Sequence, residues 1–384
     1  MAGFGLSFPI MPLFIEEEIG ITDPVALKTW VGVIQSSAAI TMAIFAPIWG
    51  HLADVFSRKA MLLRAMLGGA VVISLMGLVN SPWQFLILRT IQGCLSGTIS
   101  AATVLTAAIS PPAQVAFTLG MLTTGIAIGN SLGPMAGGIL SDFLGYRVAF
   151  FATGIVLAMA SMVALKFIED DRRPKAERKA TKLKLFPDLK PIAASPMLVT
   201  IMLVTFGVNA ASMAASPMLP LFIKELVLLN SGEAAFIGSS TGIVMGVGAA
   251  FTAIAAVLVG KFSLRFGYWK TLLFCITAGA VFTLPQAFAV NITQLTVLRA
   301  MSSFFLGGTG PVINAIIAVT AEKKIQGTSF GVNSSVGSAG SALGPLIGSM
   351  SAMLGGYRAV FIATASLLGL SAWNTARRRK LNLS

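Results

Sequence analysis

The sequence presents one apolar stretch after another, each close to the roughly 20 residues that an α-helix needs to span a bilayer. Hydrophobic residues make up 55% of the 384 residues and charged residues only 11%, and the mean hydropathy is +0.85. A water-soluble core of this length could not hide so much apolar surface. We therefore expect an all-α integral membrane protein. Eleven full spans are predicted over residues 29–53, 60–79, 83–108, 115–141, 147–168, 196–224, 235–260, 269–289, 293–319, 327–353 and 357–376.

The segment before these spans, Met1–Ile15, is apolar but short, and it has no basic flank of the kind that a signal peptide carries. The two halves of the sequence resemble one another, and their alignment places Met1 opposite Asn209. The span of the second half that contains Asn209 begins earlier, near Pro196. We interpret Met1–Ile15 as the outer end of a first span whose beginning is missing. The prediction is therefore twelve spans, with the first one truncated.

An internal repeat appears when the two halves are aligned at an offset of about 210 residues. The pattern Pro-x-x-Pro-Leu-Phe-Ile occurs at 9–15 and again at 217–223. Residues 129–153 match residues 340–364 with 11 identities in 25 positions, several of them Gly, Pro, Tyr and Arg. Chance matching of apolar segments would favour Leu, Ala and Val instead. Duplication is the better account.

The repeat predicts two six-helix bundles in the same orientation, an architecture that places a substrate site at mid-membrane between the halves. We expect an N-terminal bundle over residues 1–168 and a C-terminal bundle over residues 195–384. A charged cytoplasmic linker, residues 169–194, is expected to join them.

The basic residues are concentrated at alternate ends of the predicted spans. These ends carry 21 of the 27 Lys and Arg residues, nine of them between Lys166 and Lys190. This asymmetry places the linker and the C-terminus in the cytoplasm of a multi-pass protein of the cell (inner) membrane. The formal net charge of +13 does not indicate nucleic-acid binding, because the charges are divided among short loops between spans.

Catalytic chemistry is not indicated by the residues. Cys94 and Cys275 both fall in apolar spans, so neither predicts a disulfide or a metal site. No cluster of His, Asp or Cys predicts an enzyme, and no Gly-rich phosphate loop ending in Lys-Ser/Thr predicts ATP hydrolysis. We expect no catalytic residue, no cofactor and no metal, so the energy for any transport must come from a gradient or from a partner.

Residues 50–59, Gly-His-Leu-Ala-Asp-Val-Phe-Ser-Arg-Lys, end the second span and cross a short loop. They resemble the Gly-x-Leu-Ala-Asp-x-x-Gly-Arg-Lys signature of the major facilitator superfamily, with Ser57 where the family usually has Gly. Asp54 can accept hydrogen bonds from basic groups or from a helix N-terminus. A conformational latch is therefore predicted at Gly50, Asp54, Arg58 and Lys59. The second half has no acidic residue at this position, so the latch should be asymmetric.

Leu-Arg-Thr-Ile-Gln-Gly at 88–93 resembles the fourth-span signature of the same family. A charge at bilayer depth is costly and normally faces a polar cavity or a partner, which predicts a coupling role for Arg89, Gln92 and Asp54. The alternative is an Arg89 side chain that snorkels to the outer surface. Arg299 is the equivalent of Arg89 in the second half, but its neighbours lack the Gln-Gly pair.

The stretch 125–138 resembles the fifth-span signature of antiporters in the superfamily, especially the bacterial drug:proton antiporter (multidrug efflux) families. Small residues every four positions let helices approach closely, and a proline bends the helix. Ordinary glycine-mediated packing is the alternative. The signature residues are Gly125, Gly129, Gly133, Pro134, Gly137 and Gly138.

Polar and adaptable side chains within the spans are the candidates for a substrate cavity. Met adapts to varied shapes, which suits promiscuous binding. Each polar candidate could equally form an ordinary interhelical hydrogen bond. The candidates are Gln35, Gln92, Asn130, Phe206, Asn209, Met213, Met245, Asn314 and Asn333.

Proton coupling usually relies on a membrane carboxylate that gains and loses a proton as the cavity changes sides. None of the 14 acidic residues falls at the centre of a predicted span. Three possibilities stay open: coupling through Asp54 and Arg89, coupling through a carboxylate in the missing start of the first span, or a uniporter without coupling.

The resemblance implies a secondary active transporter that exports lipophilic or amphiphilic drugs by alternating access in exchange for protons. One alternative is a facilitator or exporter of a specific small metabolite such as a sugar, which would have a cavity richer in aromatic and amide side chains. Another is a non-transporting membrane sensor or scaffold, which would leave the signatures unexplained. The expected partners are a small lipophilic molecule, protons and the lipid bilayer, and we expect a monomer.

Overall fold

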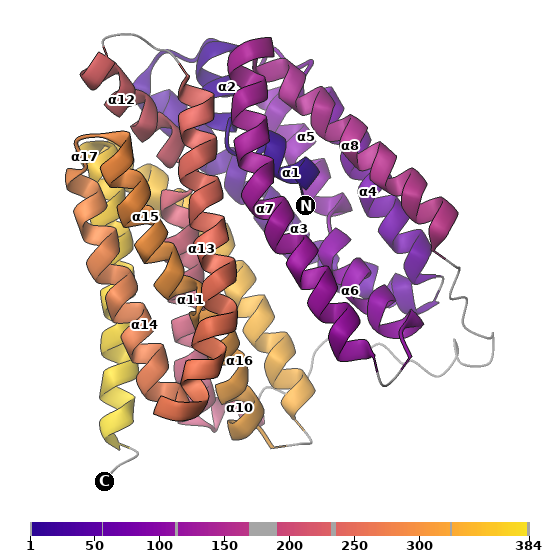
Figure 1. The fold of residues 1–384 in the computed structure, drawn as a ribbon, viewed down its shortest axis with the longest axis vertical. Coiled ribbons are helices and arrows are strands. Elements are labelled where there is room, and N and C mark those ends of the chain that lie inside the picture. Colours follow the sequence, from indigo (N-terminus) through magenta and orange to yellow (C-terminus); the bar gives the residue numbers. More distant parts are fainter. Residues whose placement is uncertain are drawn as a thin grey trace.

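A computed structural model describes residues 2–55, 57–111, 114–168, 190–231, 236–322 and 325–381. These residues form helices joined by short turns, and no β-strand occurs among them. The helices of the two halves form two groups that lie side by side and run roughly along the long axis (Figure 1). The predicted all-α membrane protein is confirmed.

The helices of the first half form one group, which we call the N-terminal bundle. They are α1 (Ala2–Ser7), α2 (Met11–Glu17), α3 (Pro24–Val55), α4 (Arg58–Met76), α5 (Pro82–Leu95), α6 (Thr98–Ile109), α7 (Val115–Leu144) and α8 (Tyr146–Phe167).

The helices of the second half form the other group, the C-terminal bundle. They are α10 (Lys190–Ala193), α11 (Pro196–Ala215), α12 (Leu219–Ser231), α13 (Ile237–Phe266), α14 (Tyr268–Thr283), the 3₁₀ helix η1 (Leu284–Phe288), α15 (Ile292–Gly307), α16 (Thr309–Thr320) and α17 (Gln326–Leu381).

Nine helical segments of the described residues are long and apolar enough to cross a membrane. The last of them, Thr328–Arg377, holds two of the predicted spans, because the helix α17 continues across a kink at Gly355 and Gly356. Exposed Leu, Ile, Val and Phe side chains are abundant on the helices, as expected where lipid tails rather than water surround them.

Three spans predicted as continuous helices, 83–108, 196–224 and 293–319, are each divided between two α-helices, and a fourth, 269–289, ends in the 3₁₀ helix η1. The first breaks at Gly97, whose φ of +128° is accessible mainly to glycine. The second breaks around Pro217, which has no N–H for the helical hydrogen bond. The third breaks at Gly308. Hydropathy averaged over a span does not register such local breaks.

The internal repeat is visible in the turns. Gly145 separates α7 from α8 with a φ of +87°, and its repeat partner Gly356 divides α17 with a φ of +72°. Both glycines precede the repeated Tyr-Arg pair. A left-handed backbone at both positions explains why glycine recurs there.

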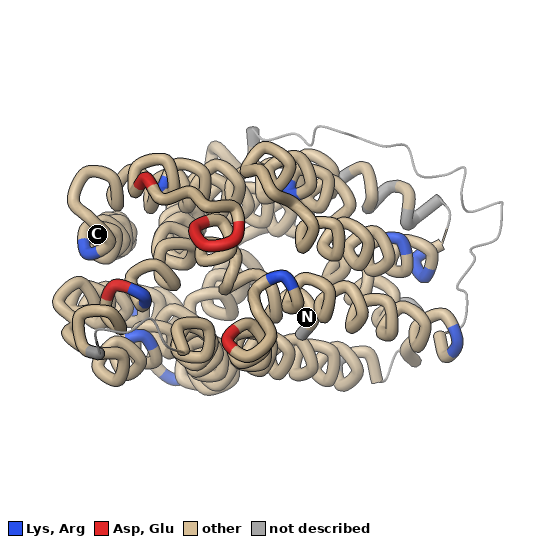
Figure 2. The backbone as a smooth tube through the Cα atoms, turned by 90° about the horizontal axis from the view of Figure 1, so that it is seen from above, with Lys and Arg blue, Asp and Glu red and all other residues tan. Residues whose placement is uncertain are grey.

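We call the end of the molecule at which α2 and α12 lie the upper end, and the end at which the chain terminates the lower end (Figure 1). In the view from above, Lys, Arg, Asp and Glu occupy few positions along the backbone trace, and most of the trace belongs to other residues (Figure 2). In the N-terminal bundle, the rings of Phe14 on α2, Phe85 in the first turn of α5 and Phe150 near the start of α8 meet with centroids 4.9–5.8 Å apart. All three side chains are fully buried.

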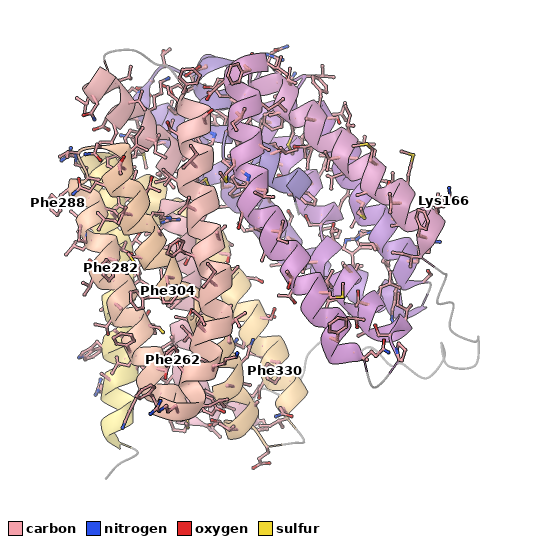
Figure 3. All side chains as sticks on the ribbon, viewed as in Figure 1. Lys166, Phe262, Phe282, Phe288, Phe304 and Phe330 are labelled. Carbon is pink, nitrogen blue, oxygen red and sulfur yellow. The ribbon has the colours of Figure 1, made fainter. Side chains whose placement is uncertain are left out.

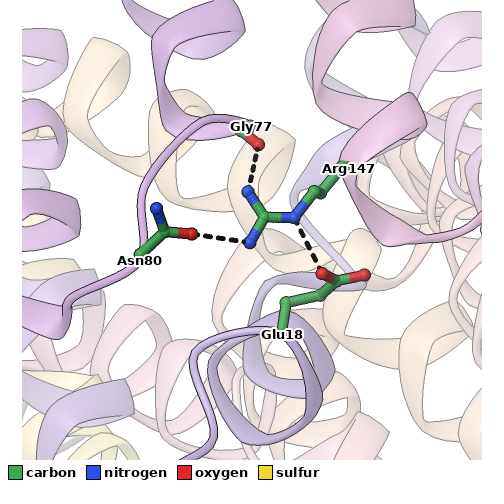
Figure 4. Close-up of polar contacts among 4 residues, drawn as sticks. All are labelled: Glu18, Gly77, Asn80 and Arg147. Atoms are coloured by element: carbon green, nitrogen blue, oxygen red, sulfur yellow. Dashed lines mark hydrogen bonds and ion pairs between the residues drawn. The ribbon is translucent and has the colours of Figure 1, made fainter.

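Arg147 ties three segments of the N-terminal bundle together at the upper end (Figure 4). Its Nε donates to Glu18 Oε2 at 2.8 Å, and its two terminal nitrogens donate to the Gly77 carbonyl oxygen at 3.0 Å and to Asn80 Oδ1 at 2.9 Å. The repeat partner of Arg147 is Arg358, which is exposed. The repeat partner of Glu18 is a leucine, so this network is specific to the first half.

Replacing Arg147 with alanine is expected to lower the stability of the folded protein by about 1–2 kcal/mol, because three acceptors lose their donor in a partly exposed site. Thermal unfolding of the detergent-purified protein measures this as a lower midpoint. Arg358→Ala is the matched control and should leave the midpoint within error. A midpoint equally insensitive to both changes would show that the three hydrogen bonds contribute nothing to stability.

Candidate transport site

A cavity of about 450 Å³ lies between the two bundles. The N-terminal bundle contributes residues of α1, α5 and α7 to its wall, and the C-terminal bundle contributes residues of α11 and α13. Pockets that bind small molecules commonly have volumes of about 300–1,000 Å³. The lining residues are Phe4, Gly5, Ser7, Phe8, Pro9, Arg89, Gln92, Asn130, Pro134, Met213, Met245 and Ala249.

Arg89 carries the only charge among these lining residues. Its Nη2 donates to Gln35 Oε1 at 2.7 Å, and its Nη1 donates to Gln92 Oε1. The guanidinium also lies 5.5 Å from the centroid of the Phe8 ring. Two amides from two helices therefore hold this cation at the cavity wall, and the snorkelling alternative is not what the structure shows.

The third nitrogen of the Arg89 guanidinium, Nε, differs from the two that donate to Gln35 and Gln92. This Nε is buried and has no hydrogen-bond partner among the described residues, and the same holds for Gln35 Nε2. A buried donor without a partner is costly unless water or a ligand satisfies it. The cavity wall therefore combines a few polar side chains, those of Ser7, Arg89, Gln92 and Asn130, with apolar residues of which Phe and Met are the largest.

The glycines of α7 let α1 approach the cavity. A Cβ added to Gly5 would lie only 2.9 Å from the Gly133 Cα, and one added to Gly137 would overlap the Leu6 carbonyl oxygen. Backbones at this separation leave no room for a side chain. The short α1 is thus seated against Gly133 and Pro134, which places Phe4 and Phe8 in the cavity wall.

The neighbouring face of α7 packs against α13 of the other bundle. A Cβ on Gly138 would overlap the Gly238 carbonyl oxygen, and a Cβ on Gly242 would overlap the Pro134 carbonyl oxygen. The two helices lie close at the upper end and diverge toward the lower end (Figure 1). Glycine on both helices permits this contact.

Asp142, in the last turn of α7, caps the first turn of α13. Its two carboxylate oxygens accept hydrogen bonds from the backbone N–H groups of Gly238, at 2.8 Å, and Ser239, at 2.7 Å. These are N–H groups that a helix start leaves without an intrahelical partner, and the positive end of the helix dipole favours the carboxylate. The contact joins the two bundles above the cavity.

Two further sets of contacts join the bundles at the upper end. Lys28 Nζ of α3 donates to the Ala352 carbonyl oxygen at 3.0 Å, and Ser349 Oγ of α17 donates to the Lys28 carbonyl oxygen at 2.5 Å. Lys224 Nζ of α12 pairs with Glu16 at 3.1 Å and with Glu17 at 2.8 Å. Together with Asp142 these contacts hold the bundles together at the upper end.

The comparisons with known proteins agree with this geometry. The sequence profile of the Major Facilitator Superfamily matches residues 1–293 and 201–381. The multidrug resistance protein MdtG of Salmonella paratyphi A is 34% identical over 384 residues, which cover 99% of this chain and 93% of that protein. MdtG of Escherichia fergusonii is also 34% identical, with 99% and 92% covered.

The chain belongs to the major facilitator superfamily. Its fold is shared with a variant of the nucleoside transporter NupG, at a TM-score of 0.80, 14% identity and coverage of 98% and 96%. The human organic anion transporter MFSD10 matches at a TM-score of 0.67, 17% identity and coverage of 97% and 95%. At such identities the likeness establishes the fold alone, and that fold is the predicted pair of repeated bundles.

The cavity brings together four of the nine residues predicted to line it in this superfamily member: Gln92, Asn130, Met213 and Met245. Gln35 stands behind Arg89 rather than in the wall. The role of each in binding stays a prediction.

The other four candidates lie elsewhere in the C-terminal bundle. Asn333 is buried and accepts a hydrogen bond from the Thr205 hydroxyl at 2.7 Å, and Asn209 donates to the Thr205 carbonyl oxygen at 2.8 Å. The first bond joins α11 and α17 and fits the interhelical alternative, whereas the second lies within α11. The Phe206 backbone packs against Gly340, and Asn314 is exposed on α16.

The predicted latch lies at the lower end. Gly50 and Asp54 fall in the last turns of α3, and their side-chain surroundings lie outside the described residues. Arg58 and Lys59 begin α4, where the Ser57 side chain caps the helix and Lys59 Nζ donates to the Leu165 carbonyl oxygen at 2.8 Å. A latch role for these residues stays a prediction.

Gly125 and Gly129 of the antiporter signature have different surroundings on α7, and Arg299 differs from Arg89. Gly129 is buried in α7, whereas a side chain at Gly125 would meet open space. Arg299 lies in α15 beside Gly248 and has no hydrogen bond to the described residues. The two intramembrane arginines are therefore not equivalent.

Sequence reasoning missed the contribution of α1 to the cavity and the role of Asp142. A signal for Asp142 existed, because its repeat partner is Met353 and a charge present in only one half suggests a specific task. No comparable signal marked Phe4 and Phe8, since their position depends on how closely α1 approaches α7.

Replacing Asp142 with alanine is expected to weaken the start of α13 by about 0.5–2 kcal/mol, the usual contribution of a helix cap. Amide hydrogen exchange over residues 237–241 should then accelerate between about twofold and thirtyfold. Asp23→Ala is the matched control, because Asp23 caps its own helix by accepting from the Ala26 N–H at 2.7 Å. Unchanged exchange over 237–241 in Asp142→Ala would mean that the carboxylate does not hold the bundles together.

Proposed function

We propose that the chain is a secondary active transporter that exports lipophilic or amphiphilic small molecules by alternating access. The observation that carries this proposal is the cavity of about 450 Å³ between the bundles, with Phe side chains from the first half, Met side chains from the second half and a single cation, Arg89, at its wall. Relatives that cover almost the whole chain are named multidrug resistance proteins. An apolar cavity with few polar groups suits varied lipophilic molecules.

The orientation that we propose follows from the charges. Most Lys and Arg residues belong to the lower end and to the segment between the bundles, which assigns that end to the cytoplasm. The close contacts of α7 with α13 and of α3 with α17 lie at the upper end, so the structure represents a conformation closed to the outside. Residues 1–168 and 195–384 would then rock against one another about the site, joined by the linker 169–194.

We further propose that export is exchanged for protons and that the protein works as a monomer in the cell (inner) membrane. None of the residues lining the cavity is a carboxylate, which favours neutral or weakly charged substrates over strong dications. In this proposal Arg89 and Gln92 respond to occupancy of the cavity, and Gly50, Asp54, Arg58 and Lys59 latch the opposite conformation at the cytoplasmic end.

The test uses everted membrane vesicles that contain the protein and follows uptake of the fluorescent dye Hoechst 33342 under an imposed proton gradient. Uptake above that of empty vesicles, abolished by an uncoupler, is the expected result. Gradient-dependent uptake of a single metabolite with none of several dyes would overturn broad drug export in favour of a narrow carrier. Uptake of dye that ignores the gradient would overturn proton exchange.

A further inference from the structure

A second hollow of the molecule lies on the C-terminal bundle, outside the transport cavity. The helices α13, α14 and α15 enclose an apolar groove of about 460 Å³ that shares no lining residue with the cavity. Figure 3 shows Phe262 and Phe304 on the face of this bundle that is turned toward the viewer. The aromatic residues lining the groove are Phe262, Phe266, Phe274, Phe304 and Phe305.

The groove is preformed by contacts between its own rings. Phe305 packs edge-on against Phe274 with centroids 5.6 Å apart, and against Phe304 at 5.5 Å. Phe262 and Phe266 stack on α13 with centroids 6.2 Å apart. These ring contacts lie within α13, within α15 and between α14 and α15, and none joins α13 to the other two helices among the described residues, so the space beside α13 stays open to an apolar chain.

Positive charge gathers at one end of the groove. Lys270 belongs to its lining, and Lys261 and Arg265 lie on the last turns of α13. All three side chains are exposed, and none forms an ion pair with the described residues. Residues 237–321 contain no Asp or Glu, so the three helices that enclose the groove carry no carboxylate to neutralise these cations.

We propose that the groove binds an anionic phospholipid, with an acyl chain among the Phe rings and the phosphate against Lys270. An apolar groove that ends in cations without an ion-pair partner among the described residues matches a molecule with an apolar chain and an anionic head. Basic residues beside a bilayer attract anionic lipids, and Lys261 and Arg265 extend that attraction. A zwitterionic lipid offers the same chains without the net charge, so the head group should decide the preference.

The inference rests on the proposed function only for its orientation, which places the basic end in the cytoplasmic leaflet. Lipid retention is measured without any transport, so the two proposals can fail separately.

The experiment is native mass spectrometry of the full chain released from detergent. The protein is incubated with palmitoyl-oleoyl phosphatidylglycerol or with the phosphatidylcholine of the same chains, and the bound copies are counted. The charge variant combines Lys261→Gln, Arg265→Gln and Lys270→Gln. The control combines Lys166→Gln and Arg377→Gln, two exposed basic residues of the same end that lie outside the groove. Size-exclusion profiles confirm that each variant is folded.

We expect the unmodified protein to retain phosphatidylglycerol at least about tenfold better than phosphatidylcholine, because each basic residue near an anionic lipid contributes about a fivefold preference. The charge variant should lose that preference and the control should keep it. The double variant Phe262→Ala with Phe274→Ala changes two exposed side chains of the groove. It should lower retention of both lipids, because the acyl chain loses part of the apolar wall that it contacts. Equal retention of the two lipids by the unmodified protein, or a preference unchanged in the charge variant, would overturn the proposal and leave the groove to apolar transport substrates.

Discussion

Replacing Arg89 with alanine should reduce gradient-driven dye uptake at least about a hundredfold, the kinetic equivalent of about 3 kcal/mol for disrupting a buried charge network. The guanidinium is the single charge of the cavity wall and holds Gln35 and Gln92 in place. Without it, both amides lose their donor and the cavity wall loses its positive charge. Uptake of Hoechst 33342 into everted vesicles measures the effect.

Arg89→Lys separates charge from geometry. Lysine keeps the positive charge but presents a compact ammonium that cannot reach two amides in the manner of a planar guanidinium. We therefore expect an intermediate loss of about tenfold. Arg358→Gln is the control, because Arg358 is exposed at the upper end. An Arg89→Ala protein that retains more than half of the uptake would remove Arg89 from the mechanism.

Replacing Gly242 with valine should prevent the bundles from closing at the upper end. A side chain there would overlap the Pro134 carbonyl oxygen of α7, and overpacking of this kind typically costs about 1–3 kcal/mol. The closed conformation would lose between about fivefold and a hundredfold of its population relative to the opposite one. Dye uptake should fall by at least about fivefold, because alternating access needs both conformations.

Spin labels report the change directly. Cysteines introduced at Val25 of α3 and Leu354 of α17, both exposed at the upper end, lie on different bundles. The distance between their labels should lengthen in Gly242→Val, after Cys94 and Cys275 are replaced by serine. Gly120→Val is the matched control on α7, because a side chain there meets open space. A distance distribution identical to that of the parent protein would show that the α7–α13 contact does not set the conformation.

Some elements of the fold were predictable because they depend on local chemistry. Apolar stretches of bilayer length predicted the spans. Lipid tails cannot form hydrogen bonds with the backbone, and a helix satisfies its backbone N–H and C=O groups internally. Gly145 and Gly356 were marked by the repeat, and both adopt the positive φ that only glycine accepts without strain. The breaks near Gly97 and Pro217 were not predicted, because averaged hydropathy is insensitive to one residue.

Some contacts of the candidate site follow from the geometry of a single helix, whereas others depend on how the helices pack. Arg89 and Gln92 are three residues apart on one helix, so their proximity follows from helix geometry. Gln35 reaches the same guanidinium from 54 positions away in the sequence. Met213 and Met245 join the cavity, whereas Asn314 is exposed and Asn333 bonds Thr205, although all four looked alike as candidates.

Local patterns in the sequence were enough to predict a membrane protein of two repeated helical bundles with an arginine at bilayer depth. The packing of the helices was needed to show that α1 rests on the glycines of α7, that Asp142 caps α13, and that the upper end is the closed one. The physical reason is that lipid tails and helix interfaces are both apolar, so hydropathy cannot tell which face of a helix meets a neighbour. That choice depends on the fit of small residues and single hydrogen bonds between helices far apart in the chain.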